Sequence, residues 1–263
     1  MTDPSETIDE HDRRTRAARR ASFDRNAALY DAVRPGYPER LVDAVIARAP
    51  GPRLLELGAG TGKATRVFAR RDVAITALEP GPELAALLRH HVAGRDVSVR
   101  ETEFERFDER GFDLVYAAQA FHWMDPETRC HRAAAAGQVL AILTNEKQPL
   151  DPDLRAELDA AYDEHFPLAW LRGSEDPVEA TRALWTGELA ASGCFGPIET
   201  LTEAWRERYP TERYIELLST YSDHAVQEDP RRLYDAIRAA IDRRGGVIEI
   251  PYLTMAFVAT ALG

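Results

Sequence analysis

Three glycines at alternate positions follow an apolar segment and form the first cluster of residues that could do chemistry. The stretch reads Arg53-Leu54-Leu55-Glu56-Leu57-Gly58-Ala59-Gly60-Thr61-Gly62-Lys63. A glycine has no Cβ to hold a ligand away from the backbone. A helix predicted from Thr61 to about Arg70 would direct its N-terminal amides toward the same place. The pattern predicts a small-cofactor site, although a tight strand-to-helix turn without a ligand would use the same residues.

Two other glycine-rich loops differ from this one at their defining positions. A P-loop has a glycine where Leu57 stands here, and Ser or Thr in place of Ala64. The dinucleotide fingerprint has its third glycine at the position of Lys63. Both differences weigh against a nucleoside triphosphate or a nicotinamide cofactor. A nicotinamide-dependent oxidoreductase is further disfavoured because the sequence has no convincing Tyr-x-x-x-Lys pair.

A second acidic residue makes the glycine loop more specific. Glu79 ends the next apolar segment in Ala77-Leu78-Glu79-Pro80, 17 residues after Gly62. A carboxylate at this place can accept hydrogen bonds from both hydroxyls of a ribose. The alternative is a negative charge that merely favours the N-terminus of the helix predicted to follow. With the loop before it, Glu79 favours a ribose-containing cofactor.

Strands and helices alternate around these residues. The predicted strands are Leu54–Leu57, Val73–Leu78, Val97–Val99, Phe112–Ala117 and Val139–Leu143. Besides the helix at Thr61–Arg70, the predicted helices are Pro82–Val92 and one that is capped by Asp125, has Pro126 at its first position and runs to about Ala136. Short apolar strands that alternate with helices indicate a parallel sheet covered on both faces, with ligands at the carboxyl ends of the strands.

The pattern changes after Asn145. A helix is predicted to open at Asp151-Pro152, and a looser stretch with Trp170 and Trp185 follows. The remaining predictions are a strand at Pro197–Arg208, helices at Thr211–Thr220 and Pro230–Arg243, and a strand at Val247–Thr260. We therefore expect a doubly wound, mostly parallel seven-stranded α/β sheet with an antiparallel finish and a helical cap inserted over about 151–195 and 211–243. Residues 1–22 are expected to form a polar tail and the start of a helix, and 23–263 the domain.

Composition excludes several classes of partner. The chain has 263 residues and a formal net charge of −11, which disfavours nucleic acid or an anionic membrane as the main partner. Its two cysteines lie far apart without a CxxC pair, so neither a disulfide framework nor a metal site is expected. No apolar run reaches the length of a membrane span, and the first residues are charged. These features predict a cytoplasmic protein, either monomer or homodimer.

Taken in order, Glu56, the three glycines, Glu79-Pro80 and the strand at Phe112-Asp113-Leu114-Val115 resemble the class I S-adenosylmethionine-dependent methyltransferases. The resemblance is strong from about Phe23 to Asn145 and looser beyond. Two segments, Phe23-x6-Tyr30-x3-Arg34-Pro35-Gly36-Tyr37-Pro38 and Ala118-Gln119-Ala120-Phe121-His122-Trp123, are similar to the small-molecule branch that includes the trans-aconitate methyltransferases. The resemblance implies S-adenosylmethionine as cofactor, with S-adenosylhomocysteine as product.

The resemblance also implies where the cofactor lies. Gly58 and Gly60 would pass beside the methionine moiety, Glu79 would hold the ribose, and Glu103 would lie near the adenine, although the family often has Asp at that place. The full expected cofactor set is Tyr30, Arg34, Glu56, Gly58, Ala59, Gly60, Gly62, Glu79, Pro80, Glu103, Phe104 and Gln119.

The acceptor is expected beyond the fourth strand, near His122. This histidine is the candidate general base or acceptor-orienting group, and the alternative is a structural role between its aromatic neighbours. Phe121, Trp123, Tyr214 and Tyr221 are candidate substrate walls, as are Trp170, Trp185 and His224, although aromatic residues in such inserts more often form their own apolar core.

The sequence thus predicts methyl transfer to a small organic acceptor, first at oxygen and in particular at a carboxylate, which would need no base. N- or C-methylation of a natural-product intermediate is the alternative within the same class. A protein that binds S-adenosylmethionine without catalysis is the alternative outside it.

Overall fold

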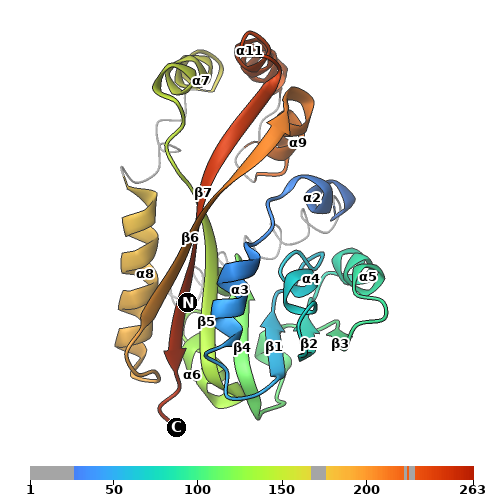
Figure 1. Ribbon diagram of the computed structural model, residues 1–263, viewed down its shortest axis with the longest axis vertical. Coiled ribbons are helices and arrows are strands. Elements are labelled where there is room, and N and C mark those ends of the chain that lie inside the picture. Colours follow the sequence, from blue (N-terminus) through green and yellow to red (C-terminus); the bar gives the residue numbers. More distant parts are fainter. Residues whose placement is uncertain (1–26, 167–175, 222–223, 225–228) are drawn as a thin grey trace, which may run out of the picture.

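A seven-stranded sheet forms the centre of the computed structural model, which describes residues 27–166, 176–221, 224 and 229–263. The strands follow the order β3-β2-β1-β4-β5-β7-β6 (Figure 1). Their bounds are β1 Arg53–Leu57, β2 Ala74–Leu78, β3 Val97–Arg100, β4 Phe112–Ala118, β5 Gly137–Lys147, β6 Glu199–Pro210 and β7 Val247–Thr260. Strands β1 to β5 run parallel, and β7 pairs antiparallel with both β5 and β6. The predicted doubly wound, mostly parallel sheet with an antiparallel finish is confirmed.

Helices cover both faces of the sheet, because successive residues of each strand point to opposite sides. Leu54 packs with Val42 and Phe68 on the face covered by α3 (Glu39–Ile46), α4 (Thr65–Phe68) and α5 (Pro82–His91). Its neighbour Leu55 packs with Ala133 and Leu189 on the face of α6 (Arg129–Ala136) and α8 (Pro177–Ser192). Both leucines are completely buried, which explains why the strands read as continuous apolar runs.

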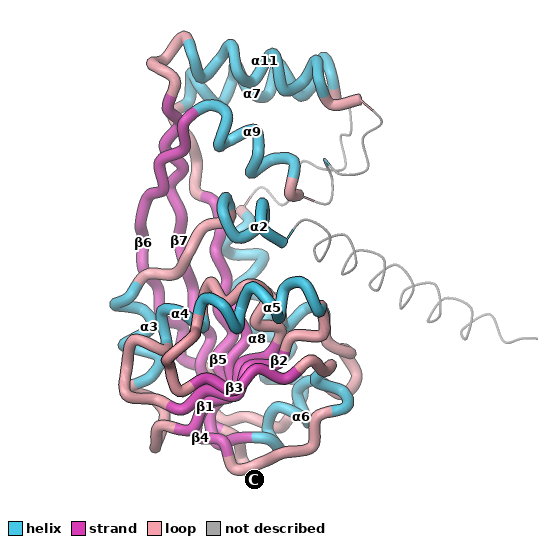
Figure 2. Tube along the Cα trace, turned by 90° about the vertical axis from the view of Figure 1, so that its right-hand side faces the viewer, coloured by secondary structure: helices cyan, strands magenta, loops and turns pink. Residues whose placement is uncertain are grey.

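Beyond the sheet, β6 and β7 continue as a twisted two-stranded ribbon that leads to a group of helices (Figures 1 and 2). These are α7 (Pro152–His165), α9 (Thr211–Ser219) and α11 (Arg231–Asp242), with α2 (Ala27–Val33) between them and the sheet. Their apolar faces share a third core that includes Leu158, Leu217 and Ile237. Asp151 caps α7 as predicted, because its side chain accepts a hydrogen bond from the Leu154 amide (3.0 Å). We call α2, α7, α9 and α11 the cap.

Two helices begin later than predicted. The helix expected from Thr61 is restricted to Thr65–Phe68, because Gly62 has φ +87° and breaks the helical path before it. Asp125 does not cap a helix directly, so that prediction is wrong. Its carboxylate accepts from the Glu127 amide (3.1 Å) and the Thr128 hydroxyl (3.1 Å), which closes a turn, and α6 starts at Arg129.

The looser stretch expected around Trp185 is in fact α8, a helix of 16 residues. Asp176 caps it by accepting from the amides of Val178 (3.1 Å) and Glu179 (3.0 Å). Trp185 and Leu189 pack on the central sheet, so α8 covers the sheet beside α6. The predicted tail at 1–22 and Trp170 lie outside the described residues. Within the described ranges, no helix combines the length and apolar character needed to cross a bilayer.

Candidate active site

The glycine loop folds back from β1 toward the end of β2. Gly58, Gly60 and Gly62 have φ values of +66°, +58° and +87°, in the region that side chains rarely adopt. The Ala59 amide donates to the Leu78 carbonyl (2.9 Å), which holds the loop against β2. The loop therefore lies at the carboxyl ends of two adjacent parallel strands, where α/β sheets bind ligands.

The three glycines have different surroundings. A Cβ on Gly58 would lie 2.8 Å from the Ala120 Cβ, and a Cβ on Gly62 would lie 2.6 Å from the Leu88 Cδ1. A Cβ on Gly60 would meet no atom within 4 Å. Gly58 and Gly62 thus permit close packing inside the protein, whereas Gly60 faces open space where a ligand can approach the backbone.

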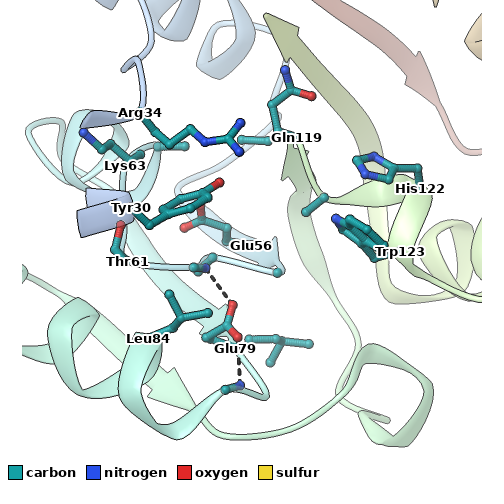
Figure 3. A pocket seen from close by; sticks show the side chains of 18 of the residues that line it. Tyr30, Arg34, Glu56, Thr61, Lys63, Glu79, Leu84, Gln119, His122 and Trp123 are labelled. Carbon is teal, nitrogen blue, oxygen red and sulfur yellow. Dashed lines mark hydrogen bonds between the residues drawn. The ribbon is translucent and has the colours of Figure 1, made fainter. Parts of the chain in front are cut away.

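Glu79 holds the glycine loop and its own turn together. One carboxylate oxygen accepts from the Gly60 amide (2.7 Å) and the other from the Gly81 amide (2.8 Å), as the dashed lines in Figure 3 show. The side chain is buried. Each carboxylate oxygen can accept more than one hydrogen bond, so these contacts leave capacity for the hydroxyls of a ribose.

A cavity of about 1040 Å³ opens over the carboxyl ends of β1, β2, β4 and β5. A volume of this order accommodates a cofactor and a small acceptor together. The structure brings most of the predicted site residues to its wall, namely Tyr30, Arg34, Glu56, Gly58, Ala59, Gly60, Glu79, Pro80, Glu103, Phe104, Gln119, His122, Trp123 and Tyr221. In Figure 3, His122 and Trp123 lie across the cavity from Tyr30 and Glu56.

Three predicted residues lie elsewhere among the described residues. Gly62 packs on Leu88, as noted above. Phe121 is buried against Trp185, with their ring centroids 5.7 Å apart. Tyr214 is buried in the core of the cap. The aromatic side chains of Phe121 and Tyr214 therefore contribute to packing, the commoner fate that the sequence left open.

The candidate walls Trp185 and His224 are also core residues. Trp185 is a residue of α8 and is buried against the central sheet, and His224 is buried in the core of the cap. The His224 Nε2 lies 3.1 Å from the Tyr162 hydroxyl, and its ring stacks on that of Phe166. These groups hold the cap together at a distance from the glycine loop.

Several wall residues were not among the predicted site residues, and they include Tyr37, Lys63, Asn145, Lys147 and Tyr252. The strand predicted to end at Leu143 continues to Lys147, which carries Asn145 and Lys147 out over the cavity. Tyr252 pairs with Lys147 in the adjacent strand. The sequence signal for these residues was the change from apolar to polar residues at the carboxyl end of β5. An α/β sheet binds ligands at the carboxyl ends of its strands.

Glu56 is a buried acid at the floor of the cavity. The Tyr116 hydroxyl donates to its Oε2 (2.8 Å). Burial raises the pKa of Glu56 to about 7, with a further contribution from the charge of Glu79, although the hydrogen bond from Tyr116 opposes the increase. A ligand cation above this carboxyl would favour its ionised form.

His122 lies on the short 3₁₀ turn η2 (Phe121–Trp123), directly after β4. Its ring centroid is 4.7 Å from that of Trp123. His122 lines the cavity and is an exposed residue. The protein atoms around the imidazole remove part of its hydration, and this burial and then the charge of Arg129 lower the pKa of His122 to about 4. The imidazole is therefore neutral near pH 7 and a weak proton acceptor.

Helix α2 connects the rest of the cap to α4. The Arg34 side chain donates to the Thr220 hydroxyl (2.9 Å) and to the Thr220 carbonyl (2.7 Å) at the end of α9. Asp31 pairs with Arg66 of α4 (2.7 Å). Tyr30 and Arg34 are thereby held over the cavity, from which α2 excludes water on one side.

The donors and open space of this site fit S-adenosylmethionine. Gly60 leaves room at the backbone, Glu79 can accept from a ribose, and Glu56 can balance the charge of an ammonium group. Among the described residues, no group of three or more His, Cys, Asp or Glu side chains is arranged to hold a metal ion.

Comparison with known proteins supports the same assignment. Residues 55–140 match a family model described as a methyltransferase domain. Uncharacterized methyltransferases of Mycobacterium tuberculosis and Mycobacterium bovis are each 35% identical over 105 residues, which cover 40% of this chain and 43% of each relative. The match thus spans less than half the length of these curated relatives.

A solved structure of a candidate type II methyltransferase from Anaeromyxobacter dehalogenans has the same fold. It is 22% identical, with a TM-score of 0.63 over 86% of this chain and 97% of that one. The family match covers β1 to the middle of β5, which are the strands that carry the glycine loop, Glu79 and His122. Residues 55–140, which contain the glycine loop, Glu79 and His122, are therefore similar to a methyltransferase domain.

Proposed function

We propose that the protein transfers a methyl group from S-adenosylmethionine to the carboxylate of a small organic acid. The observation that carries this proposal is a pair of cations on the cavity wall. The Arg34 Cζ lies 4.2 Å and the Lys147 Nζ 4.4 Å from the centroid of the Tyr221 ring. All three residues line the cavity, where they form a positively charged end suited to an anionic acceptor.

The distribution of lysine supports this assignment. The chain contains only two lysines among 33 basic residues, Lys63 and Lys147, and both line the cavity. Because the net charge of the protein is −11, an anionic acceptor needs local positive charge to enter. The Lys147 ammonium has three N–H donors and uses one of them toward the Tyr221 hydroxyl, so it can also donate to an acceptor.

The low pKa of His122 agrees with a carboxylate acceptor. A general base works best with a pKa near the working pH, and that of His122 is about 4. A carboxylate arrives ionised and needs no base, so His122 and Trp123 would orient it. The resemblance of the sequence to the small-molecule branch supports the same class of acceptor.

The cofactor, when bound, supplies an activated methyl group to a nucleophile aligned with it. We propose that Glu79 accepts from its ribose, Glu56 faces its ammonium, and the Gly60 backbone passes beside its methionine portion. Tyr30 on α2 would exclude water from the same end. The contribution of the protein is then mainly proximity and orientation.

Transfer of labelled methyl groups to a panel of small acids, amines and phenols tests the proposal. A methyl ester releases labelled methanol in alkali, so we expect an alkali-labile product from an acid. An alkali-stable product would instead indicate N- or C-methylation, or a methyl ether formed from a phenol, and would refute the proposal. Binding of S-adenosylhomocysteine without transfer to any acceptor would favour the non-catalytic alternative.

Lys147 provides a sharper test of the acceptor site. Lys147→Met should raise KM for the acid by about tenfold or more, because an ion pair within the cavity is lost. Lys147→Arg should restore most of the affinity. Arg206→Met, which removes an exposed cation paired with Glu249, controls for net charge. An unchanged KM in Lys147→Met would exclude this lysine as the anchor.

A further inference from the structure

The first residue of α6, Arg129, is a buried cation that joins α8 to the turn η2. Its Nε donates to Glu188 Oε1 (2.6 Å), and its Nη2 donates to Glu188 Oε2. The third nitrogen, Nη1, donates to the backbone carbonyl of Phe121 (3.0 Å). Every nitrogen of the guanidinium therefore has a partner, and one carboxylate holds it at two points.

The carbonyl that Arg129 holds belongs to the peptide that leads directly into His122. A planar guanidinium fixed by two bonds to Glu188 can direct its third donor in only one direction. The same guanidinium packs over the rings of Phe121 (5.3 Å) and Trp185 (5.2 Å). The orientation of this peptide, and with it the direction of the His122 side chain, therefore depends on Arg129.

The backbone before η2 needs such support. Gln119 has φ +53°, which is unusual for a residue other than glycine. Its amide donates to the Leu143 carbonyl (2.9 Å), and its side chain donates to the Asn145 carbonyl (3.1 Å). These bonds attach the segment to β5 at one end, and Arg129 attaches it to α6 and α8 at the other.

Helix α8 also reaches the cavity directly. Pro177 lines the cavity at its N-terminus, and the Thr181 hydroxyl donates to Glu146 Oε1 (3.1 Å) on the wall. Glu188 lies further along the same helix and acts through Arg129. The helix that covers the sheet thus contacts the acceptor end of the cavity at Pro177 and Thr181 and, through Glu188, supports η2.

We propose that Arg129, held by two hydrogen bonds to the Glu188 carboxylate, is a positioning residue that orients His122 and Trp123 and so shapes the acceptor end of the cavity. The inference rests on the proposed function in placing the acceptor there, but its geometry is independent of which acid binds. The charge of Arg129 also acts on His122: burial of the imidazole and this charge both lower the pKa of His122. The other charged residues that line the cavity are Arg34, Glu56, Lys63, Glu79, Glu103, Glu105, Glu146 and Lys147.

The test compares Arg129→Met with Arg129→Lys and Glu188→Gln. Carbon-13 labelled histidine reports the pKa of His122 by NMR, with His122→Asn to assign its signal. In Arg129→Met we expect an upward shift of about half a unit or more, because a positive charge beside the imidazole is removed. Glu188→Gln leaves that charge and should give no upward shift, which keeps the inference testable if Arg129→Met fails to fold. A purely structural role would predict the same direction in both variants.

Kinetics complete the test. Arg129→Met should lower kcat by about tenfold while the affinity for S-adenosylhomocysteine stays within about twofold, because the cofactor end is untouched. Arg129→Lys keeps the positive charge but lacks the planar guanidinium that makes two parallel hydrogen bonds. It should therefore keep the pKa of His122 low and still reduce kcat in part. Arg71→Met, which removes the Arg71–Asp43 pair remote from the cavity, should change neither.

The outcomes separate the two proposals. If the His122 pKa and kcat are unchanged in a folded Arg129→Met, the positioning role is refuted. An upward shift in Glu188→Gln would refute it equally. If instead the wild type fails to bind S-adenosylhomocysteine, the proposed function fails, and the NMR titration of His122 still decides the role of Arg129.

Discussion

Gly60 and Gly62 offer a matched pair of substitutions that separates cofactor contact from loop structure. Both residues have positive φ, so an alanine at either position bears the cost of a left-handed backbone. The two differ in what the new methyl group meets. At Gly60 it meets open cavity, and at Gly62 it would lie 2.6 Å from the Leu88 Cδ1.

The expected free-energy changes follow from these contacts. Gly60→Ala should lower the free energy of unfolding by about 1–2 kcal/mol through backbone strain alone. Gly62→Ala should add about 1–3 kcal/mol to that strain, because Leu88 must move. The order reverses for binding: only the methyl group at Gly60 projects into the cofactor space, and it should raise Kd for S-adenosylhomocysteine by about tenfold or more, or about 1.4 kcal/mol.

Urea unfolding and isothermal titration calorimetry with S-adenosylhomocysteine measure the two quantities on the same preparations. We expect Gly62→Ala to be the less stable variant and Gly60→Ala the weaker binder. Wild-type affinity in Gly60→Ala would refute the placement of the cofactor at this backbone. A Gly62→Ala protein that is folded but has lost the cofactor would also contradict it, because the Gly62 Cβ position faces Leu88.

Three further substitutions test the acids and the histidine of the site. Glu79→Gln replaces one of the two oxygens that accept hydrogen bonds from the Gly60 and Gly81 amides. We therefore expect the free energy of unfolding to fall by about 1–3 kcal/mol and the cofactor affinity to decrease. An unchanged urea denaturation curve would contradict the bridging role of Glu79. The pKa of Glu56 is about 7 in the folded protein and near 4.5 in the unfolded chain, so its contribution to the free energy of unfolding is complete below about pH 4.5 and is lost as the pH rises to 7. Glu56→Gln should remove this loss. If the free energy of unfolding of the variant and the wild type falls equally between pH 4.5 and 7, the prediction is wrong. The pKa of His122 is lowered from 6.5 to about 4, so its contribution to the free energy of unfolding is complete above pH 6.5 and is lost as the pH falls toward 4. His122→Asn should abolish this decrease at acid pH, as measured by urea unfolding. If the decrease persists in the variant, it arises from other groups.

The cofactor end of the site could be predicted from the sequence because its determinants are local. Glycines at alternate positions, an acidic residue at the end of the following strand and short apolar strands all act over a few residues. Glu79 illustrates this: its place at the end of β2 puts it beside the glycine loop in any parallel sheet in which β1 and β2 are neighbours. The antiparallel finish was also predicted, because the chain ends in a strand, inserted helices and another strand after the parallel part of the sheet.

Other features were present in the sequence but were read incorrectly. Asp176-Pro177 opens α8 with the same cap as Asp151-Pro152 at α7, yet only the second was recognised. The helix carries Trp185 and Leu189 as buried residues, so its apolar face was available. Asp125 had the residue types of a helix cap, but its carboxylate closes a turn instead, and the two outcomes differ by only a few residues of backbone.

The acceptor end depends on contacts between residues far apart in the chain, which no local pattern encodes. Tyr221 lies beside Arg34 and Lys147 only because α9 docks on α2 and because β5 extends past the sheet to pair with β7. Arg129 reaches Glu188 across 59 positions of sequence. Residue spacing thus determined the fold class and the place of the glycine loop and Glu79, which depend on short-range backbone geometry. The tertiary structure alone decided which distant side chains line the cavity together, because long-range packing brings the cap, β5 and α8 to one place.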